Sequence, residues 1–540
     1  MVERFGLPFL PHAIMKAMMK SWMRRPQCVP FLLAAIAFLS TLLIQSGELG
    51  TSDTMHRLQT AHAFWTGEPA VFPSEYPEFG LIGRGGRLYS WYGIGQSLLM
   101  LPADIVATGF ERLPIFANYN GRDPAVRSIF VSFTTNLLIS VLTALLAYRL
   151  LLSFEFTAKQ AAAGVLALLF ATTHLHYAQN MSENNYIFLL TLTGICFQYD
   201  WLRGGSRRAL FLGSTSLGLN LLTRITTGLD LLAAGGFLLL VLLLEKSDLK
   251  TIGRRAIEYL RTALPIYAAF GLIDRIYQYH RFGSFFNTYI GIFGAQQRAL
   301  DPSLPAAYPF EGHFLDGFLG PLFAPEKSIF LFDPLLLLAL LVTALYWRRL
   351  AGVLRAYTIV AWLLLFAYIC FYAKYTVWTG DFAWGDRYVS TAAQMVALLA
   401  VPVFLRHCEP DRSWLRVTAG VVVGVSVMIQ LASLCFWLPL EIYQMETLGH
   451  PTFVIALRFK NIAAFALGKM SAWGLNYEAI SQDAWDYVHI TCWNFVPFVL
   501  RRVGAAPGWV IDSLMTVWAL ALAGLLWLLD RLRSALQSLA

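Results

Sequence analysis

Long apolar runs separated by polar segments dominate the chain from residue 29 to its C-terminal part. A helix that spans a membrane needs roughly 20 apolar residues, and about twelve runs reach or approach that length. The predicted spans are Val29–Gln45, Ile129–Leu152, a third ending near Thr173, a fourth ending at Trp201, a hairpin pair around Leu222–Asp230, Tyr259–Leu272, Ile329–Tyr346, Tyr357–Tyr372, a tenth after Ser390, Val417–Leu438 and Val510–Leu529. The pattern predicts an all-α polytopic membrane protein, a bundle of about twelve transmembrane helices.

Basic residues mark one side of the predicted membrane. Lys16, Lys20 and the pair Arg24-Arg25 precede the first span, and basic residues recur in the short inner turns. Because Lys and Arg of short loops stay in the cytoplasm, the N-terminus is predicted to lie inside, ahead of an uncleaved first span. The pair Arg501-Arg502 is an exception, since it falls in an outer segment. We expect a multi-pass protein of the bacterial inner (cytoplasmic) membrane.

The composition agrees with this class. Of the 540 residues, 57% are hydrophobic and only 14% are charged, against roughly 25% charged residues in soluble proteins. The net charge of +8 is explained by Lys and Arg residues that anchor the topology, so no nucleic-acid partner is expected. The six cysteines have no CxxC or metal spacing, and neither a disulfide framework nor a zinc site is predicted.

All the long loops face the outer side, where the active site is therefore expected, on the periplasmic face. They are Ser46–Gly95, Tyr277–Lys327, Lys374–Ser390 and Pro439–Pro507. The chain is divided into a transmembrane module of residues 1–438, an outer C-terminal segment of residues 439–509, and a last helix with a short cytoplasmic tail, residues 510–540.

Two parts of the first outer region carry further expectations. The stretch Ser97–Phe110 contains Pro102 and Asp104, so it is predicted to be too short and too broken to span and to lie in the membrane interface. The segment Gly83–Arg87 is glycine-rich and basic, but it follows no predicted strand, so a nucleotide-binding loop is not expected.

Asp53 opens the first outer loop. A carboxylate beside an apolar span is either drawn into water or held for chemistry. Leu58, Ala61 and Trp65 follow at helical spacing and predict an amphipathic helix that lies on the membrane, with interfacial helices in this loop. A plainer role is also open, because Ser52 or Asp53 would serve as the N-cap of that helix.

Glu183 is a second carboxylate on the same side, in the segment His174–Asn185, which is rich in hydrogen-bonding groups. The alternative to a functional role is a solvated turn that caps the fourth span. His174 and His176 are two residues apart, a weak metal signal, because helical ligands are usually three or four apart. No metal site is predicted, although a carboxylate pair could bind a divalent metal.

Four cations share the outer side with these carboxylates: Arg57, Arg224, Lys327 and Arg387. A guanidinium in an apolar setting needs an anion, and its planar donors match a phosphate. Arg387 has an alternative in an ion pair with Asp386 or Asp381, and Lys327 has one in snorkelling.

Aromatic residues crowd the same face: Trp65, Tyr76, Tyr89, Trp91, Tyr92, Trp378 and Trp384. Most are expected to belong to interfacial belts, and a few could stack on a sugar ring. As candidates for sugar or acceptor binding we single out Trp91, Tyr92, His176, Trp378 and Asp386.

Several motifs, taken in order and with their sidedness, resemble polytopic glycosyltransferases of the GT-C fold, near the protein mannosyltransferase and lipid A aminoarabinose transferase group. They spread over roughly residues 29–405. They are Asp53 with Arg57, Gly85–Gly93 before Leu101-Pro102, Tyr186 after Glu183, Leu222-Thr223-Arg224, Arg281–Tyr289, Gly320–Phe330 leading to Asp333-Pro334, and Trp384-Gly385-Asp386-Arg387-Tyr388.

The resemblance implies a GT-C-like bundle and a polyprenyl-phosphate-linked sugar donor bound from the membrane lipid. The acceptor would be a hydroxyl of a glycan, lipid or protein, and no cofactor is required. Asp53 matches the catalytic carboxylate of the first loop, and Glu183 falls at the acidic position of the second loop. Where protein mannosyltransferases carry an acidic pair, this chain has Asp53-Thr54. The outer C-terminal segment matches no motif of that group.

The residues also fit an inverting transfer on chemical grounds. Asp53 would take the proton of the acceptor hydroxyl while Glu183 orients the acceptor. Arg57, Arg224, Arg387 and Lys327 would hold the donor phosphate. Two other classes remain open: a lipid or sugar transporter or flippase, which would move substrate without Asp53, and a non-catalytic subunit of an envelope assembly complex, which would turn over nothing.

Overall fold

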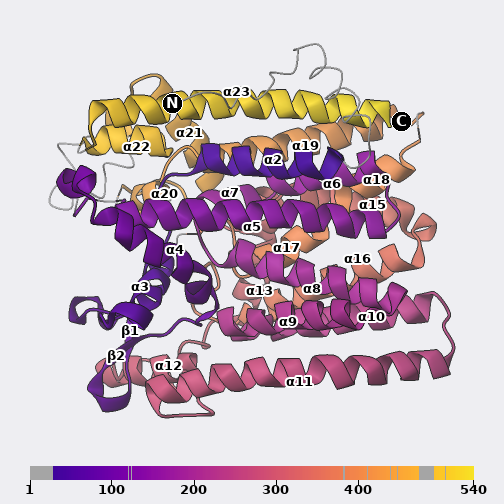
Figure 1. Ribbon diagram of the computed structural model, residues 1–540, viewed down its shortest axis with the longest axis horizontal. Helices are drawn as coiled ribbons and strands as arrows, with labels where there is room; N and C mark the ends of the chain where they lie inside the picture. Colours follow the sequence, from indigo (N-terminus) through magenta and orange to yellow (C-terminus); the bar gives the residue numbers. More distant parts are fainter. Residues whose placement is uncertain are drawn as a thin grey trace, which may run out of the picture.

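The computed structural model describes residues 28–119, 121–122, 124–380, 383–409, 411–437, 439–446, 448–473, 492–504 and 506–539. The basic residues ahead of the first span lie outside these ranges, as does Asp381. Within them nearly all the regular secondary structure is helical, with two short strands (Figure 1), so the predicted all-α class is confirmed.

Seven helical runs in the described residues are long and apolar enough to cross a membrane. They are α5 Val126–Ser153, the run Ile225–Leu244 that contains α10, α11 Leu249–Phe282, α16 Gly352–Tyr372, the run Ser390–His407, α19 Ser413–Ser433 and α23 Gly508–Ser538. Three shorter apolar helices are α2 Cys28–Ile44, α6 Ala158–Phe170 and α13 Phe314–Phe323. The chain is a membrane protein by this criterion, and the count of twelve spans stays a prediction.

The described residues form further helices, together with the helices that make up the runs Ile225–Leu244 and Ser390–His407. They are α3 Ser52–Thr66, α4 Gly95–Glu111, α7 His174–Gln179, α8 Asn184–Gly204, α9 Arg207–Thr223, α10 Gly228–Leu244, α12 Tyr289–Leu300, α14 Ile329–Phe332, α15 Leu335–Tyr346, α17 Ser390–Ala397, α18 Ala400–His407, α20 Pro439–Glu446, α21 Val454–Ala466 and α22 Val496–Val503. The predicted span Ile329–Tyr346 is split at Asp333, whose backbone is non-helical, because the residue before a proline is driven out of the helical region. The predicted span Tyr259–Leu272 is part of a much longer helix, α11.

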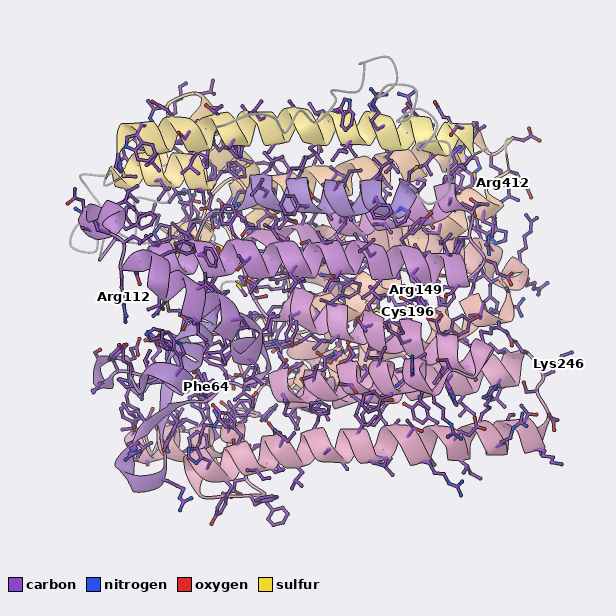
Figure 2. All side chains as sticks on the ribbon, in the orientation of Figure 1. Phe64, Arg112, Arg149, Cys196, Lys246 and Arg412 are labelled. Carbon is purple, nitrogen blue, oxygen red and sulfur yellow. The ribbon has the colours of Figure 1, made fainter. Side chains whose placement is uncertain are left out.

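The long helices run side by side, and their two ends differ (Figure 1). We call the end that carries α3, α4 and α12 the loop end, and the opposite end the turn end. Figure 2 shows Phe64 and Arg112 at the loop end, and Lys246 and Arg412 at the turn end. Lys246 and Arg412 come from turns that the sequence assigns to the inside, so the predicted sorting of loops into two sets corresponds to two ends of the bundle.

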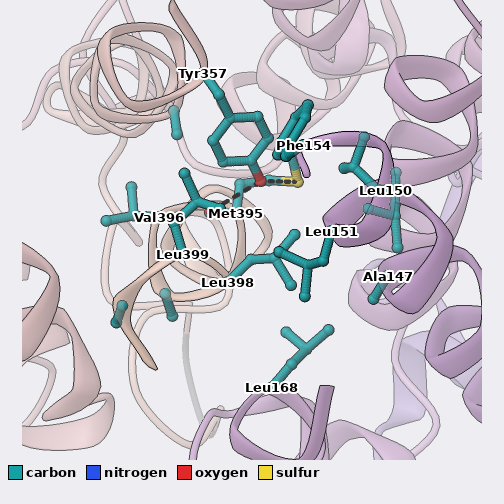
Figure 3. Close-up of a cluster of buried hydrophobic side chains, with 14 of the residues drawn as sticks. Ala147, Leu150, Leu151, Phe154, Leu168, Tyr357, Met395, Val396, Leu398 and Leu399 are labelled. Carbon is teal, nitrogen blue, oxygen red and sulfur yellow. Dashed lines mark hydrogen bonds between the residues drawn. The ribbon is translucent and has the colours of Figure 1, made fainter. Parts of the chain in front are cut away.

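An apolar core lies between α5, α16 and α17 (Figure 3). Phe154, Leu151 and Met395 pack there, and each of them is at most 1% exposed to solvent. Tyr357 is also buried, and its hydroxyl donates to the carbonyl of Met395 at 2.9 Å, because a buried tyrosine oxygen needs a partner. This core packs together three of the helices that run towards the loop end.

The first outer region departs from two expectations. Gly83–Arg87 does follow a strand: β1 Gly80–Ile82 pairs antiparallel with β2 Leu88–Ser90. The expectation failed because each strand has only three residues and Gln296 of α12 supplies edge contacts to the main chain of Ile82. The predicted break at Pro102 is also absent, since α4 is continuous through it.

Candidate functional site

Asp53 lies in the first turn of α3, but it is not the cap of that helix. The N-cap is Thr51, whose hydroxyl accepts a hydrogen bond from the N–H of Thr54 at 3.3 Å, so the cap expectation for Ser52 or Asp53 is wrong. The Asp53 carboxylate is instead shared between two distant groups. The Tyr92 hydroxyl donates to Oδ1 at 2.6 Å, and Arg387 Nη1 donates to Oδ2 at 2.7 Å.

The start of α3 is fixed against the loop that carries Glu183. The Thr54 hydroxyl donates to the carbonyl of Met181. Gly50, at φ +80°, approaches so closely that a Cβ there would lie 2.7 Å from Cα of Asn180. Only glycine allows both this backbone conformation and this approach. Thr54, the residue where the chain departs from an acidic pair, therefore joins the two loops.

Glu183 is 3% exposed, so the alternative of a solvated turn is wrong. Its Oε2 lies 2.7 Å from Nη1 of Arg57, and its Oε1 pairs with Arg224. Arg57 also lies over the ring of Tyr92, 4.3 Å from the centroid. The segment that carries α3, the loop before α8 and the α9–α10 hairpin thus meet at one carboxylate.

Together these contacts form one cluster of two carboxylates and three guanidinium groups, which we call the acid–arginine cluster. Its members are Asp53, Arg57, Glu183, Arg224 and Arg387. The sequence predicted all five as site residues, and the structure brings them together at the loop end. With each group ionised, the cluster carries a net charge of one positive unit.

The arginines control the ionisation of both carboxylates. Burial would raise the pKa of Asp53, but Arg387 and then Arg57 outweigh it and hold the pKa below its ordinary value. Burial would likewise raise the pKa of Glu183, and Arg57, Arg224 and Arg387 together hold it well below the ordinary range. Both side chains are therefore ionised at neutral pH.

The close approach of the first loop to the α9–α10 hairpin depends on Gly93 and Gly95. A Cβ on Gly93 would lie 2.4 Å from the carbonyl oxygen of Leu222, and one on Gly95 would lie 2.1 Å from Oγ1 of Thr223. Any larger residue would push the first loop away from the α9–α10 hairpin.

Aromatic rings that the sequence did not single out line the cations. Tyr388 lies 5.4 Å from the guanidinium carbon of Arg224 and 5.3 Å from that of Arg387, measured to its ring centroid. Tyr372 stacks on Tyr388 with centroids 4.3 Å apart. The Trp-Gly-Asp-Arg-Tyr motif contained Tyr388, so its position beside Arg387 was the available signal, whereas nothing in the sequence marked Tyr372.

Arg281 is a further buried cation that was not assigned a role, although it opens one of the motifs. It donates through Nη1 to the main-chain carbonyls of Ser90 and Tyr92, the latter at 3.0 Å. It also lies over the ring of Tyr277, 4.0 Å from the centroid. Arg281 therefore holds the chain that presents Tyr92 to Asp53.

Lys327, predicted as a phosphate ligand, lies against main chain. Its Nζ donates to the carbonyls of Ala383 and Gly385 at 2.7 and 3.3 Å. Asp386 accepts from the N–H of Tyr388 at 2.9 Å, and burial raises its pKa. Both residues hold the loop of residues 383–388, which we call the Arg387 loop.

The other predicted sugar-binding residues are dispersed. Trp91 packs edge-to-face on Phe293 of α12, with centroids 4.5 Å apart. Trp378 covers α13, where a Cβ on Gly320 would lie 2.1 Å from its ring. His176 is buried and stacks on Trp384, with centroids 5.8 Å apart. Tyr92 is the member of the predicted set that donates a side-chain hydrogen bond to a carboxylate of the acid–arginine cluster.

The amphipathic helix predicted after Asp53 exists, but its apolar residues Leu58 and Ala61 are fully buried inside the protein. At its far end, His62 Nδ1 lies 2.9 Å from Oδ2 of Asp104, and Trp65 Nε1 donates to the same oxygen at 2.8 Å. This buried carboxylate ties α3 to α4, so α3 is anchored at both ends.

Within the described residues, no group of three or more His, Cys, Asp or Glu side chains could hold a metal ion. Comparison with known proteins adds no assignment: no protein-family model matches the chain, and no curated protein matches it. The likeness to GT-C glycosyltransferases therefore rests on the chain's own motifs.

Proposed function

We propose that the protein is an integral-membrane glycosyltransferase that moves a sugar from a polyprenyl-phosphate-linked donor to an acceptor hydroxyl at the outer face of the membrane. The observation that carries the proposal is the acid–arginine cluster. Three guanidinium groups converge on the buried carboxylate of Glu183 and the partly buried carboxylate of Asp53, at one end of an apolar bundle. Buried charges of this kind are rare in membrane proteins and mark functional sites.

The charge of the cluster fits the proposed donor. A sugar phosphodiester of a polyprenol carries one negative charge, which complements the net positive unit of the five ionised side chains. Guanidinium groups bind phosphate oxygens through two parallel hydrogen bonds. Arg224 and Arg387 flank Tyr388 and would accept the phosphate between them, with Arg57 beside them.

The reaction needs one proton acceptor and one stabilised leaving group. The acceptor oxygen forms a bond to the anomeric carbon of the sugar, the bond from that carbon to the phosphate oxygen breaks, and the phosphate leaves with the electron pair. Asp53 takes the proton of the acceptor hydroxyl. The arginines stabilise the charge that develops on the leaving phosphate.

Donor binding would also activate Asp53. The contact with Arg387 holds the pKa of Asp53 low, which makes the carboxylate a weak base. A phosphate that draws Arg387 away would raise that pKa towards the operating pH, where general bases are most effective. The base would therefore gain strength when the donor is in place.

The test compares purified wild type with Asp53→Asn and with Asp316→Asn, which changes an exposed carboxylate at the loop end. Release of polyprenyl phosphate is measured from a panel of polyprenyl-phosphate sugars, with envelope extract as acceptor. Release by wild type and by Asp316→Asn, but not by folded Asp53→Asn, supports the proposal and identifies the donor. Full release by Asp53→Asn contradicts it.

A further inference from the structure

The outer C-terminal segment contacts the Arg387 loop through one buried cation. Arg458 of α21 is 0% exposed and forms a two-pronged ion pair with Glu441 of α20, at 2.5 and 2.6 Å. Its guanidinium carbon lies 5.2 Å from the ring centroid of Trp384. Ile455 of the same helix belongs to the apolar cluster that contains Trp384 and Phe332.

Arg458 is also fixed to the end of a long helix. Its Nη1 donates to the carbonyls of Ser433 at 2.9 Å and Phe436 at 3.0 Å. These carbonyls belong to the last turn of α19 and the residues after it, beside which α21 lies (Figure 1). Free carbonyls at a helix end attract cations. Arg458 is thus held rigidly between α19, α20 and the indole of Trp384.

Trp384 transmits this contact to the acid–arginine cluster. It precedes Arg387 by three residues, its carbonyl accepts from the Tyr177 hydroxyl at 3.1 Å, and its ring meets Phe332 edge-to-face at 5.0 Å. Gly385, at φ +70°, turns the chain directly after it. With Trp384 clamped, the short remainder of the loop leaves Arg387 little freedom in its approach to Asp53.

We propose that Arg458 is a positioning residue: paired with Glu441, it clamps Trp384 so that Arg387 reaches Asp53. The outer C-terminal segment would then be a structural part of the catalytic site, supplied from outside the motif-bearing region of residues 29–405. The consequence for catalysis rests on the proposed function, but the clamp itself does not.

The first experiment needs no activity. Hydrogen exchange at the amides of Ala383, Tyr388 and Val389 is compared between wild type and the double variant Arg458→Met with Glu441→Leu, which removes both charges and leaves no buried charge unpaired. We expect exchange about tenfold faster in the double variant, equivalent to about 1.4 kcal/mol of local opening free energy. Arg458→Lys should recover part of the protection. The control Lys460→Gln, on the exposed face of α21, should match wild type.

The second experiment tests the effect on catalysis through the acid limb of the pH profile of kcat/KM for polyprenyl phosphate release, which reports the pKa of Asp53 before the donor is bound. The groups that act on Asp53 are Arg387, Arg57, Glu183 and Tyr92, together with His56 on the same helix. Arg387 favours the ionised form, so its displacement raises the pKa of Asp53 and moves the acid limb to higher pH. A merely structural loss would lower the rate at every pH and leave the limb in place.

The outcomes separate the two proposals. Unchanged exchange in the double variant overturns the clamp, whatever the activity. Faster exchange with an unmoved acid limb overturns the claim that the clamp positions Arg387. Absence of release by wild type, with faster exchange in the double variant, contradicts the glycosyltransferase proposal and leaves the clamp supported.

Discussion

The substitution Gly93→Ala tests whether the close approach of the first loop to the α9–α10 hairpin is required for activity. A Cβ at this position would lie 2.4 Å from the carbonyl oxygen of Leu222 and 2.5 Å from that of Thr223. An ordinary contact begins at 3.4 Å, so the two main chains must separate by about 1 Å, because neither atom belongs to a side chain that can turn away. Tyr92 and Arg224, the neighbours of these residues, would move apart with them.

Gly93→Ala is expected to lower the rate of transfer strongly and the stability of the fold moderately. A misplacement of about 1 Å at a reacting site lowers the rate by about 100-fold, or about 2.7 kcal/mol of transition-state stabilisation. Overpacking costs about 1–3 kcal/mol of folding free energy. The rate of polyprenyl phosphate release measures the loss of activity, and the thermal midpoint of the purified protein measures the loss of stability.

The matched control is Gly109→Ala in α4, where a Cβ would meet no atom within 4 Å. Alanine at a helical position is more favourable than glycine by up to about 1 kcal/mol, so this variant should keep the wild-type rate, with a thermal midpoint equal to or above that of wild type. A Gly93→Ala protein with wild-type rate and midpoint would refute the reasoning, because the separation of the two chains would then have no consequence.

Three further outcomes follow from the same contacts. Tyr92→Phe removes the 2.6 Å hydrogen bond to Asp53, which favours the ionised carboxylate, so the acid limb of the rate profile should move to higher pH; an unmoved limb counts against this contact. Glu183→Gln leaves Arg57 and Arg224 without their buried partner and should lower the free energy of unfolding by about 3–5 kcal/mol, measured by thermal unfolding at pH 7. The near-neutral control is Glu409→Gln, which changes an exposed partner of Arg349 at the turn end. The folded-state pKa of Glu183 is depressed, so the ionised side chain stabilises the fold fully above its unfolded pKa of about 4.3, and this stabilisation is lost as the pH falls towards the folded-state pKa. The difference in stability between wild type and Glu183→Gln should therefore shrink below about pH 4. A difference in stability that stays constant with pH would contradict the ion pairs.

The sequence predicted the class of fold because apolar length and basic turns are local signals. The positions at which helices end were harder to predict from the sequence. The predicted span Ile329–Tyr346 missed the break at Asp333-Pro334, although the proline is a local signal for it. The short strands of the β1–β2 hairpin depend on contacts from Arg281 and Gln296, about 200 residues away in the chain. No local pattern encodes such support.

The members of the acid–arginine cluster were predictable, and their partners were not. Burying a charge is costly, which marked Asp53 and Arg387 as candidates, but the pairing of Arg387 with Asp53 joins loops that only the folded bundle brings together. Lys327 and His176, which the sequence also singled out, contact the Arg387 loop, and their predicted roles in ligand binding stay predictions. Residue type indicated the candidate residues, and the tertiary fold determines which of them lie together.

Binding of a prenyl phosphate to the acid–arginine cluster tests the central claim most directly. The binding of farnesyl phosphate to detergent-purified wild type, Arg224→Gln and Arg149→Gln can be titrated by calorimetry. Arg149 pairs with Asp200 away from the cluster, so its variant controls for loss of charge. We predict saturable binding by wild type and Arg149→Gln, and binding at least about tenfold weaker by Arg224→Gln, since a charge-assisted hydrogen bond contributes about 1.5–3 kcal/mol. Equal binding by all three proteins, or none by folded wild type, would contradict the account.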